Sequence, residues 1–470
     1  MNPKEICYAS IDDLHQKYAD GSLTPSAVVE ALFHRIRDVD KKVNSYISLM
    51  EESARKEASE AEKQIKRFGT SRKLLGIPIG LKDAIDVSGV RTTRGSKLFA
   101  NHVAVGDAQV VQRLRAHGAV LTGKLNMDEF AFGLTTDCSY FGPTRNPWDQ
   151  SMMSGGSSGG SAAAVGAGLC TGSIGTDAGG SVRVPSSLCG VVGLKPTYGI
   201  VNTAGISPFC WSITHVGPIA RTVSDVRTIF DVLIDDAIKD HPLLKKSVKD
   251  ASKLEEGLQG VRVGVLREYF QPATDEKVER LFLNGLSVLE DLGAELTDVS
   301  IPVFEYSRVA GAVIIASESA SIYMNDLRNR KEEMVKEIRT RLMVGTVLSA
   351  LDYVAAQKIR RLVREGISKA LKSVDILAVP TTPITAPPIK ATHVEVRGKK
   401  VRLYNLLARF TTVFSMAGVP ALSVPCGITN ESLPVGLQLI GRPLDEYSLF
   451  KVGEHYEQAT KYYARLKEII

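Results

Sequence analysis

The order of the expected elements predicts an α/β protein with a substantially parallel sheet, because short apolar segments alternate with helical ones along much of the chain. Composition supports a folded chain, since 44% of residues are hydrophobic and 23% are charged, which is ordinary for globular proteins. The length of 470 residues exceeds the roughly 250–300 residues of one usual core. Length alone therefore favours two or three domains.

The first part of the chain, residues 10 to 68, is expected to be helical. Ser10 begins a capping-box pattern. Thr24 is followed by proline, as at the start of a helix, and apolar residues then recur at helical spacing. Residues 51 to 68 are charged and thinly apolar, which is typical of an exposed helix. Nothing in this segment predicts catalysis.

The next segment, residues 74 to 86 (LLGIPIGLKDAID), is apolar and bounded by glycine and proline. It is expected to be a buried strand. Lys82 stands near its end. Because lysine is almost never fully buried unless it is paired, Lys82 is either an exposed strand end or a functional group.

The remaining segments continue the alternation of strands and helices. Residues 108 to 123 predict a helix and then a strand. Further along, the patterns predict a polar loop with helical pieces at 235–260, strands at 261–266 and 294–302, a helix at 275–292, mainly helices over 306–372, a strand leading into a proline-rich loop at 374–388, and strands within 411–427 and 434–441.

The most informative stretch runs from Ser154 to Thr197, where glycine, serine and alanine are interspersed with apolar runs. A flexible Gly/Ser linker carries little apolar content, whereas small residues of this kind allow backbones to approach closely. The stretch lacks the Gly-Lys-Ser/Thr of a P-loop, and a dinucleotide pattern that begins at Gly166 fails at Thr171. Residues 155–159 match G-x-S-x-G, but no strand precedes them, as a nucleophile elbow requires.

Two parts of this stretch, GGSSGGSAAAVGAG and GTDAGGSVRVPSSLCGVVGLKPTYG, closely resemble the amidase signature family, and GIPIGLKDAIDVSGVRTTRGS upstream is similar to its lysine segment. Weaker similarity (GVPALSVPCG, PVGLQLIGRP) extends almost to the C-terminus. The resemblance implies one compact α/β domain over residues 1–470, with a large mixed twisted sheet flanked by helices. Residues 1–70 would be a helical leader, 75–225 would carry the catalytic motifs, and 226–470 would complete the sheet and the substrate pocket.

We prefer this single domain to the division that length favours, because the catalytic segments form one continuous stretch. The resemblance implies a Ser–cis-Ser–Lys triad for amide hydrolysis, with Ser181 as nucleophile, Ser157 in the cis peptide bond and Lys82 as base. Lys82 must be neutral to act. Burial in an apolar strand lowers the pKa of lysine from about 10.4, and a value of about 7–8 would suit a base.

Two further sets of residues follow from the resemblance. Amide cleavage needs donors aimed at the developing oxyanion, and the backbone N–H groups of consecutive small residues can form such a nest; the expected donors are Ala178, Gly179, Gly180 and Ser181. The residues expected around the triad, which either assist it or form a purely structural network, are Ser158, Asp177 and Arg183.

Two branches of the family compete for the substrate: stand-alone amidases, and the A subunit of the tRNA-dependent amidotransferase, which releases ammonia from glutamine with partner subunits. Residues 211–218 depart from the amidotransferase pattern. Ala408 and Arg409 stand where that branch carries an aspartate for the glutamine ammonium, unless an acid such as Asp352 occupies the same space. A charge without a partner is costly, so we expect a stand-alone amidase. The alternative is the A subunit of the amidotransferase, and a non-catalytic scaffold is a minor third.

Other classes of function are not expected. The chain has no apolar stretch of about 18 residues and no secretory signal pattern at its start, which predicts no membrane contact and a cytoplasmic location. Six cysteines and eight histidines show no ligand spacing, so no metal or cofactor is expected. The net charge of +6 comes from interspersed residues, which argues against direct nucleic-acid binding. The expected partner is a small-molecule amide, with tRNA only through partner subunits and a homodimer left open.

Pocket walls are expected within residues 125–140, 205–215 and 306–350.

Overall fold

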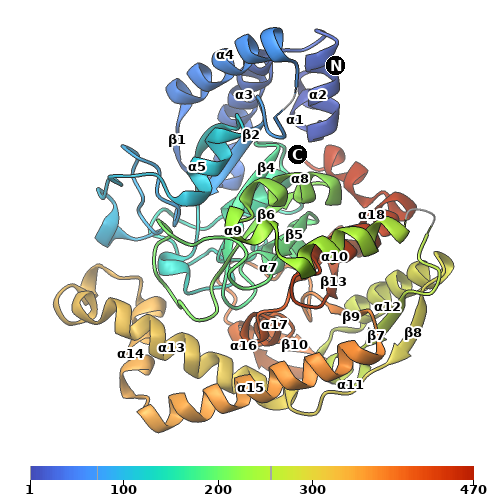
Figure 1. The fold of residues 1–470 in the computed structure, drawn as a ribbon. Coiled ribbons are helices and arrows are strands. Elements are labelled where there is room, and N and C mark those ends of the chain that lie inside the picture. The colour runs from blue at the N-terminus through green and yellow to red at the C-terminus, as the bar shows by residue number, and fades with distance from the viewer. Residues whose placement is uncertain (1, 71, 255–256) are drawn as a thin grey trace.

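The centre of the protein is a mixed sheet of eleven strands, seen in a computed structural model that describes residues 2–70, 72–254 and 257–470 (Figure 1). From one edge to the other the strands are β1 (Tyr46–Leu49), β3 (Val120–Leu125), β2 (Pro78–Lys82), β4 (Gly172–Asp177), β6 (His215–Ala220), β5 (Val192–Lys195), β12 (Ala421–Ile428), β13 (Pro434–Ile440), β9 (Ile376–Pro380), β7 (Arg262–Val265) and β8 (Glu295–Asp298). A separate hairpin pairs β10 (His393–Val396) with β11 (Lys399–Arg402).

Strand direction divides this sheet into three parts. Strands β3, β2 and β4 run parallel to one another, as do β9, β7 and β8, whereas the other adjacent pairs in the described sheet are antiparallel. The mixed sheet implied by the resemblance is confirmed, and the expectation of a substantially parallel sheet holds only for the two flanks. One reason lies in β12 and β13, because a short turn can join only antiparallel neighbours.

Helices surround the sheet (Figure 1). They are α1 (Pro3–Cys7), α2 (Ile11–Ala19), α3 (Pro25–Val43), α4 (Glu51–Phe68), α5 (Gln109–Ala116), α6 (Gly159–Gly166), α7 (Arg183–Cys189), α8 (Val223–Leu233), α9 (Asp236–Lys239), α10 (Pro242–Ala251), α11 (Arg267–Phe270), α12 (Glu276–Asp291), α13 (Phe304–Asn329), α14 (Lys336–Val347), α15 (Ala350–Ser373), α16 (Leu403–Leu407), α17 (Thr412–Ala417) and α18 (Glu446–Thr460).

Two helix pairs frame the central strands. Helices α6 and α7 pack against each other and against β4 and β5, while α8 and α18 pack against β6 and β12. A side chain added at Gly172 of β4 would meet α8, and one added at Gly175 would meet Ser158 and Val182, next to α6 and α7. Because residues 172 and 175 differ in parity, they point to opposite faces of the sheet. The motif-bearing helices α6 and α7 therefore cover one face and α8 covers the other.

Two expectations about individual elements are wrong. Residues 46–49, expected to be helical, form β1, an edge strand only four residues long that pairs with β3. Residues 412–417, expected within a strand, form α17, and the strand begins only at Ala421. All six residues of helix α17 are buried, including the polar Thr412 and Ser415, so its sequence lacks the periodicity of a helix with one exposed face. Gly418, with φ of 74°, ends it.

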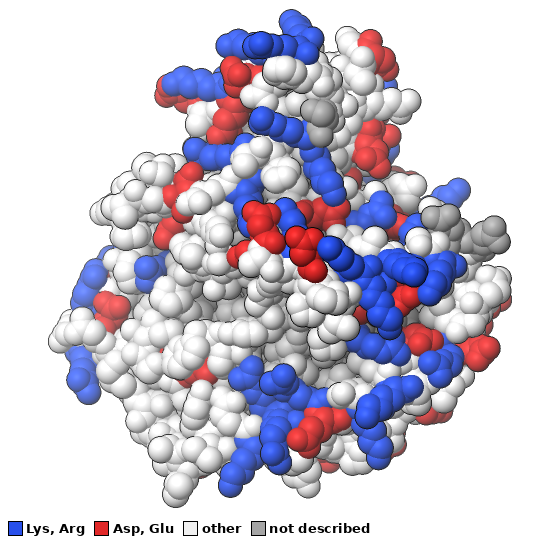
Figure 2. All heavy atoms as spheres, in the orientation of Figure 1, with Lys and Arg blue, Asp and Glu red and all other residues white. Residues whose placement is uncertain are grey.

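Helices α13, α14 and α15 form a separate layer, drawn in yellow-brown and orange in Figure 1, and α13 also packs on α17. On the face shown in Figure 2, basic and acidic side chains are interspersed over much of the surface. Within the described residues no single helix has the length and apolarity to cross a membrane, although α14 and α15, bent by 98° at their junction, reach that threshold as a pair.

Candidate active site

The amine of Lys82 lies at the end of β2 and is fully buried. Its Nζ donates to the hydroxyl of Ser157 at 2.7 Å and to that of Thr176 at 2.8 Å. Burial lowers the pKa of Lys82 to about 7, against the opposing pull of the Asp128 and Asp177 carboxylates. Near neutral pH a large share of this amine is uncharged and able to accept a proton.

Ser157 is brought to Lys82 by the loop that leads into α6. The Gly156–Ser157 peptide bond is cis, as the resemblance implied. The next residue, Ser158, donates its backbone N–H to the carbonyl of Ser181 at 3.1 Å, which joins this loop to the turn that carries Ser181. Among the described residues, no hydrogen bond within 3.5 Å joins the hydroxyls of Ser157 and Ser181, so the last link of the predicted relay stays a prediction.

Ser181 lies at the wall of a narrow cavity of about 40 Å³, and the residue is 5% exposed. Each of the three segments expected to form pocket walls contributes to this cavity, and residues 404–412 add a fourth wall that we did not expect. The described lining residues are Ala131, Phe132, Gly133, Leu134, Gly179, Ser181, Phe209, Arg308, Ala312, Ile315, Tyr404, Ala408 and Thr412.

The turn before Ser181 is shaped by Asp177, at the end of β4. Its carboxylate accepts the backbone N–H of Gly180 at 2.8 Å and that of Val182 at 3.1 Å. The N–H of Gly180, one of the four expected oxyanion donors, is therefore engaged with Asp177. In the described chain no hydrogen bond outside the regular elements uses the N–H groups of the other three expected donors, Ala178, Gly179 and Ser181.

Gly180 itself has φ of 128°, in the region that favours glycine. A Cβ there would overlap the hydroxyl oxygen of Thr411. The hydroxyls of Thr411 and Thr412 donate to the carbonyl of Gly179 at 2.6 Å and 3.1 Å. Helix α17, to which Thr412 belongs, thus contacts the turn that carries Ser181 from the outside.

Arg183 and Asp177 form a buried bidentate ion pair, with Nε–Oδ2 at 3.0 Å and a terminal nitrogen–Oδ1 at 2.8 Å. Burial raises the pKa of Asp177, but the Arg183 guanidinium outweighs burial and holds it below the usual range. Arg183 also donates to Gln438 of β13 at 2.6 Å and to Ser415 of α17 at 2.8 Å. Neither member of the pair lines the cavity, which supports the structural alternative for both.

Asp128 is a buried acid that the sequence analysis did not single out. Its carboxylate accepts the N–H groups of Thr135, Thr136 and Cys138 at 3.0–3.3 Å, and its own N–H donates to the carbonyl of Ser157 at 3.3 Å. Burial, chiefly, raises the pKa of Asp128 to about 6. Its oxygens lie near those of Asp137 and the Cys138 sulfur, but the backbone donors already engage them. Asp128 therefore shapes the loop around Ser157.

The sequence held little signal for these additional residues. Thr176 directly precedes Asp177 inside the glycine-rich stretch, and the alternation of side chains along a strand could have placed it on the opposite face from Asp177. Asp128 occurs in the segment expected to form a pocket wall, but nothing in its neighbours distinguishes it from an exposed acid. Gln438 and Ser415 reach Arg183 from more than 200 residues away.

The position expected to bind a glutamine ammonium contains no acid among the described side chains. Ala408 lines the cavity, while the Arg409 guanidinium lies 5.4 Å from the centre of the Tyr269 ring. Asp352 is elsewhere, at the exposed start of α15, where its carboxylate accepts the N–H and hydroxyl of Ser349 at 2.8 Å. Asp352 therefore does not replace the missing aspartate.

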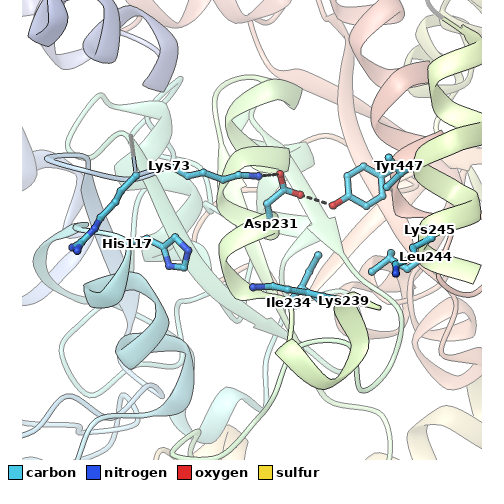
Figure 3. Close-up of a pocket in the computed structure, with 10 residues that line it drawn as sticks. Lys73, His117, Asp231, Ile234, Lys239, Leu244, Lys245 and Tyr447 are labelled. Atoms are coloured by element: carbon cyan, nitrogen blue, oxygen red, sulfur yellow. Dashed lines mark hydrogen bonds and ion pairs between the residues drawn. The ribbon is translucent and has the colours of Figure 1, made fainter. Parts of the chain in front are cut away.

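A wider hollow of about 470 Å³ lies on the surface between residues 72–73 and the α8–α10 region (Figure 3). Its central acid is Asp231, which forms an ion pair with Lys73 and accepts the hydroxyl of Tyr447 at 2.7 Å. Two of its other lysines, Lys239 and Lys245, pair with neighbouring aspartates. This groove contains no hydroxyl–amine pair like that of Ser157 and Lys82 in its described lining, so the chemistry points to the narrower cavity.

The chain is similar to known proteins over nearly its whole length. Residues 27–450 match the family model described as Amidase. The chain is 39% identical to the A subunit of glutamyl-tRNA(Gln) amidotransferase from Roseiflexus sp. (strain RS-1), with 98% of each chain covered.

Two solved structures share this fold. One, described as the crystal structure of an amidase, superposes with a TM-score of 0.88 at 33% identity and covers 96% of this chain and 100% of that one. The other, the A subunit of glutamyl-tRNA(Gln) amidotransferase from Thermotoga maritima, gives 0.75 at 35% identity and covers 97% of this chain and 94% of that one.

Proposed function

Since this chain belongs to the amidase signature family, we propose that it hydrolyses a carboxylic amide through an acyl-Ser181 intermediate. The observation that carries the proposal is the buried amine of Lys82, bonded at 2.7 Å to the Ser157 hydroxyl beside the cavity that Ser181 lines. A base of this kind activates a serine that is unreactive on its own.

The reaction would proceed in two halves. Oγ of Ser181 attacks the amide carbon, and its proton passes through the Ser157 hydroxyl to the neutral amine of Lys82. The N–H groups of Ala178, Gly179 and Ser181 would stabilise the oxyanion. When the tetrahedral intermediate collapses, the C–N bond breaks and the leaving nitrogen takes the proton from Lys82. Water then attacks the ester by the same route in reverse, which releases the acid and restores Ser181.

Two classes of amide are candidates for this reaction. The sequence relatives are named as the A subunit of an amidotransferase. Their name supports ammonia release from glutamine within a complex of subunits better than it supports a stand-alone amidase. The cavity favours the stand-alone amidase, because Ala408 lines it and none of its described lining residues is acidic. The ammonium of glutamine would lack a charge partner there. We keep the stand-alone amidase as the first candidate on this pocket chemistry.

Ammonia release by the purified chain tests both candidates. Benzamide, pentanamide and glutamine are supplied separately, first to the chain alone and then with amidotransferase partner subunits and charged tRNA. A stand-alone amidase hydrolyses benzamide or pentanamide unaided and glutamine poorly, whereas glutamine preference that rises with partners supports the amidotransferase alternative. The Ser181→Ala protein is the control: it should fold normally and lose about 10⁴-fold or more of the activity. Wild-type turnover by this variant would refute the proposal.

A further inference from the structure

The cavity beside Ser181 has one charged residue among its described lining residues, Arg308 of α13. The remaining lining residues are apolar or carry only hydroxyl groups and backbone. We propose that the amide substrate carries a carboxylate and that Arg308 binds it, so that Arg308 determines which amides are hydrolysed. This proposal rests on amide hydrolysis at Ser181.

Arg308 is available for such a contact. It lines the cavity and is an exposed residue, and none of the ion pairs within 4.0 Å in the described part of the chain includes it. Glu305 lies one turn earlier on α13 and is also exposed, but it forms no ion pair with Arg308 within that distance. A guanidinium without a carboxylate partner offers paired donors that match the two oxygens of a carboxylate.

The surroundings of the cavity add positive charge to that of Arg308. The guanidinium of Arg341 lies 4.2 Å from the ring centre of Tyr404 and donates to the carbonyl of Phe132, and both of these residues line the cavity. Arg409 follows the lining residue Ala408 and contacts the Tyr269 ring.

The buried carboxylate of Asp128 does not cancel this charge. Asp128 lies behind Gly133, where an added Cβ would overlap its carboxyl group. Its oxygens are turned to the backbone N–H groups of Thr135, Thr136 and Cys138. Asp128 is not among the lining residues. A substrate in the cavity thus meets a cation and no described acid, the reverse of what an ammonium group requires.

The cavity also limits the substrate's size. The cavity is narrow, with a volume of about 40 Å³, and its walls include the rings of Phe132, Phe209 and Tyr404. A short unbranched chain fits this space better than a bulky group. The proposed substrate is therefore a short aliphatic amide with a carboxylate at its far end.

Three amides that differ by one group at a time test this proposal. Glutaramate has the chain, amide and carboxylate of glutamine without its ammonium, and pentanamide lacks the carboxylate as well. We expect wild-type kcat/KM for glutaramate to exceed that for pentanamide by about tenfold or more, because glutaramate gains a charged hydrogen bond to Arg308. It should exceed kcat/KM for glutamine by a similar factor, because the ammonium of glutamine would be left without a charge partner. Equal rates for glutaramate and pentanamide would overturn the proposal.

Variants then assign the preference to Arg308. Arg308→Gln should lower the glutaramate-to-pentanamide ratio by about tenfold, Arg308→Lys should retain part of it, and Arg308→Glu should abolish it. The matched control is Arg328→Gln, which changes another exposed arginine of the same helix, away from the cavity. If the glutaramate-to-pentanamide ratio fell equally in Arg328→Gln, or persisted in Arg308→Glu, Arg308 would not be the residue that binds the carboxylate.

Binding to the Ser181→Ala protein separates this proposal from the proposed reaction. Titration calorimetry with glutaramate and with pentanamide needs no turnover. Tighter binding of glutaramate that disappears in the Ser181→Ala, Arg308→Gln double variant supports the carboxylate site even if the wild type hydrolyses neither amide. If the wild type instead hydrolyses pentanamide and the Ser181→Ala protein binds both amides alike, the proposed reaction stands and the carboxylate site fails.

Discussion

Two lysines near the ends of neighbouring parallel strands, Lys82 of β2 and Lys124 of β3, are both fully buried. Their partners differ. The amine of Lys124 lies 3.3 Å from the Asp83 carboxylate and donates to Thr92 at 2.9 Å, whereas the hydrogen bonds of Lys82 go to two hydroxyls. Burial lowers the pKa of Lys124, but the Asp83 carboxylate opposes this at ion-pair distance. Burial alone therefore does not make a lysine a base; the chemistry of its partners decides.

The strand geometry explains how adjacent residues reach different partners. Lys124 is in register with Leu81, and Lys82 with Leu125. Side chains in register on neighbouring strands share a face of the sheet, so Lys124 lies on the same face as Leu81. Because Lys82 follows Leu81 along β2, its side chain points to the opposite face. Asp83 directly follows Lys82 in the sequence, yet it pairs with Lys124. Lys82 is thereby left with two hydroxyl partners, those of Ser157 and Thr176.

Lys82→Met should cause the largest change within this comparison. The variant keeps an apolar side chain of similar length and loses the base, so kcat/KM near pH 7 should fall by about 10²–10⁴-fold. Part of the activity should return in alkali, where hydroxide replaces the amine. Ammonia release measured from pH 6 to 10 (roughly the range in which a tuned lysine titrates) checks this, and an equal loss at every pH would indicate a structural role for Lys82.

Lys124→Met is the matched substitution on the other face. It leaves Asp83 buried without its charge partner, which should lower the free energy of unfolding by about 3–5 kcal/mol. Urea denaturation measures the loss, and the double variant Asp83→Asn, Lys124→Met should recover part of it. If Lys82→Met destabilised the protein more than Lys124→Met, the contrast between an ion-paired and a hydroxyl-bonded lysine would be wrong.

The dependence of kcat/KM on pH tests the same contrast between Lys82 and Lys124. Because the pKa of Lys82 is lowered to about 7, the amine is protonated and inactive below that pH and becomes a base above it. Wild-type kcat/KM should therefore rise through about pH 7. A mildly destabilised Lys124 variant that is still folded should keep this rise, and Lys82→Met should lose it. A rise centred instead near pH 10 would mean that Lys82 remains charged in the folded protein.

The smallest effect is expected from metal removal. The proposed steps use only serines, a lysine and backbone N–H groups, and the oxygens of Asp128 already accept backbone donors. Dialysis against a chelator should leave the rate unchanged. Activity that is lost on dialysis and restored by a divalent ion would contradict the serine–lysine chemistry.

The sequence by itself determined the residue types of the site and the local shape around them. The glycine-rich motifs, through their resemblance to the amidase signature family, indicated Ser157 and Ser181 as site residues and Asp177 and Arg183 as their neighbours, because such motifs can be recognised from contiguous residues alone. The apolar segment around Lys82 likewise predicted a buried strand. Several of the longer helices were also predicted from caps and periodicity, as with the capping box at Ser10, but α8 and α18 were not.

Only the tertiary structure decided which of these groups meet. Thr176 reaches Lys82 across 94 residues, and Gln438 reaches Arg183 across 255. The order and direction of the strands, and the placement of Arg308 at the wall that Ser181 shares, depend on the same long-range packing. Local patterns carry no information about such contacts, because each is set by how whole strands and helices bury their apolar faces against one another.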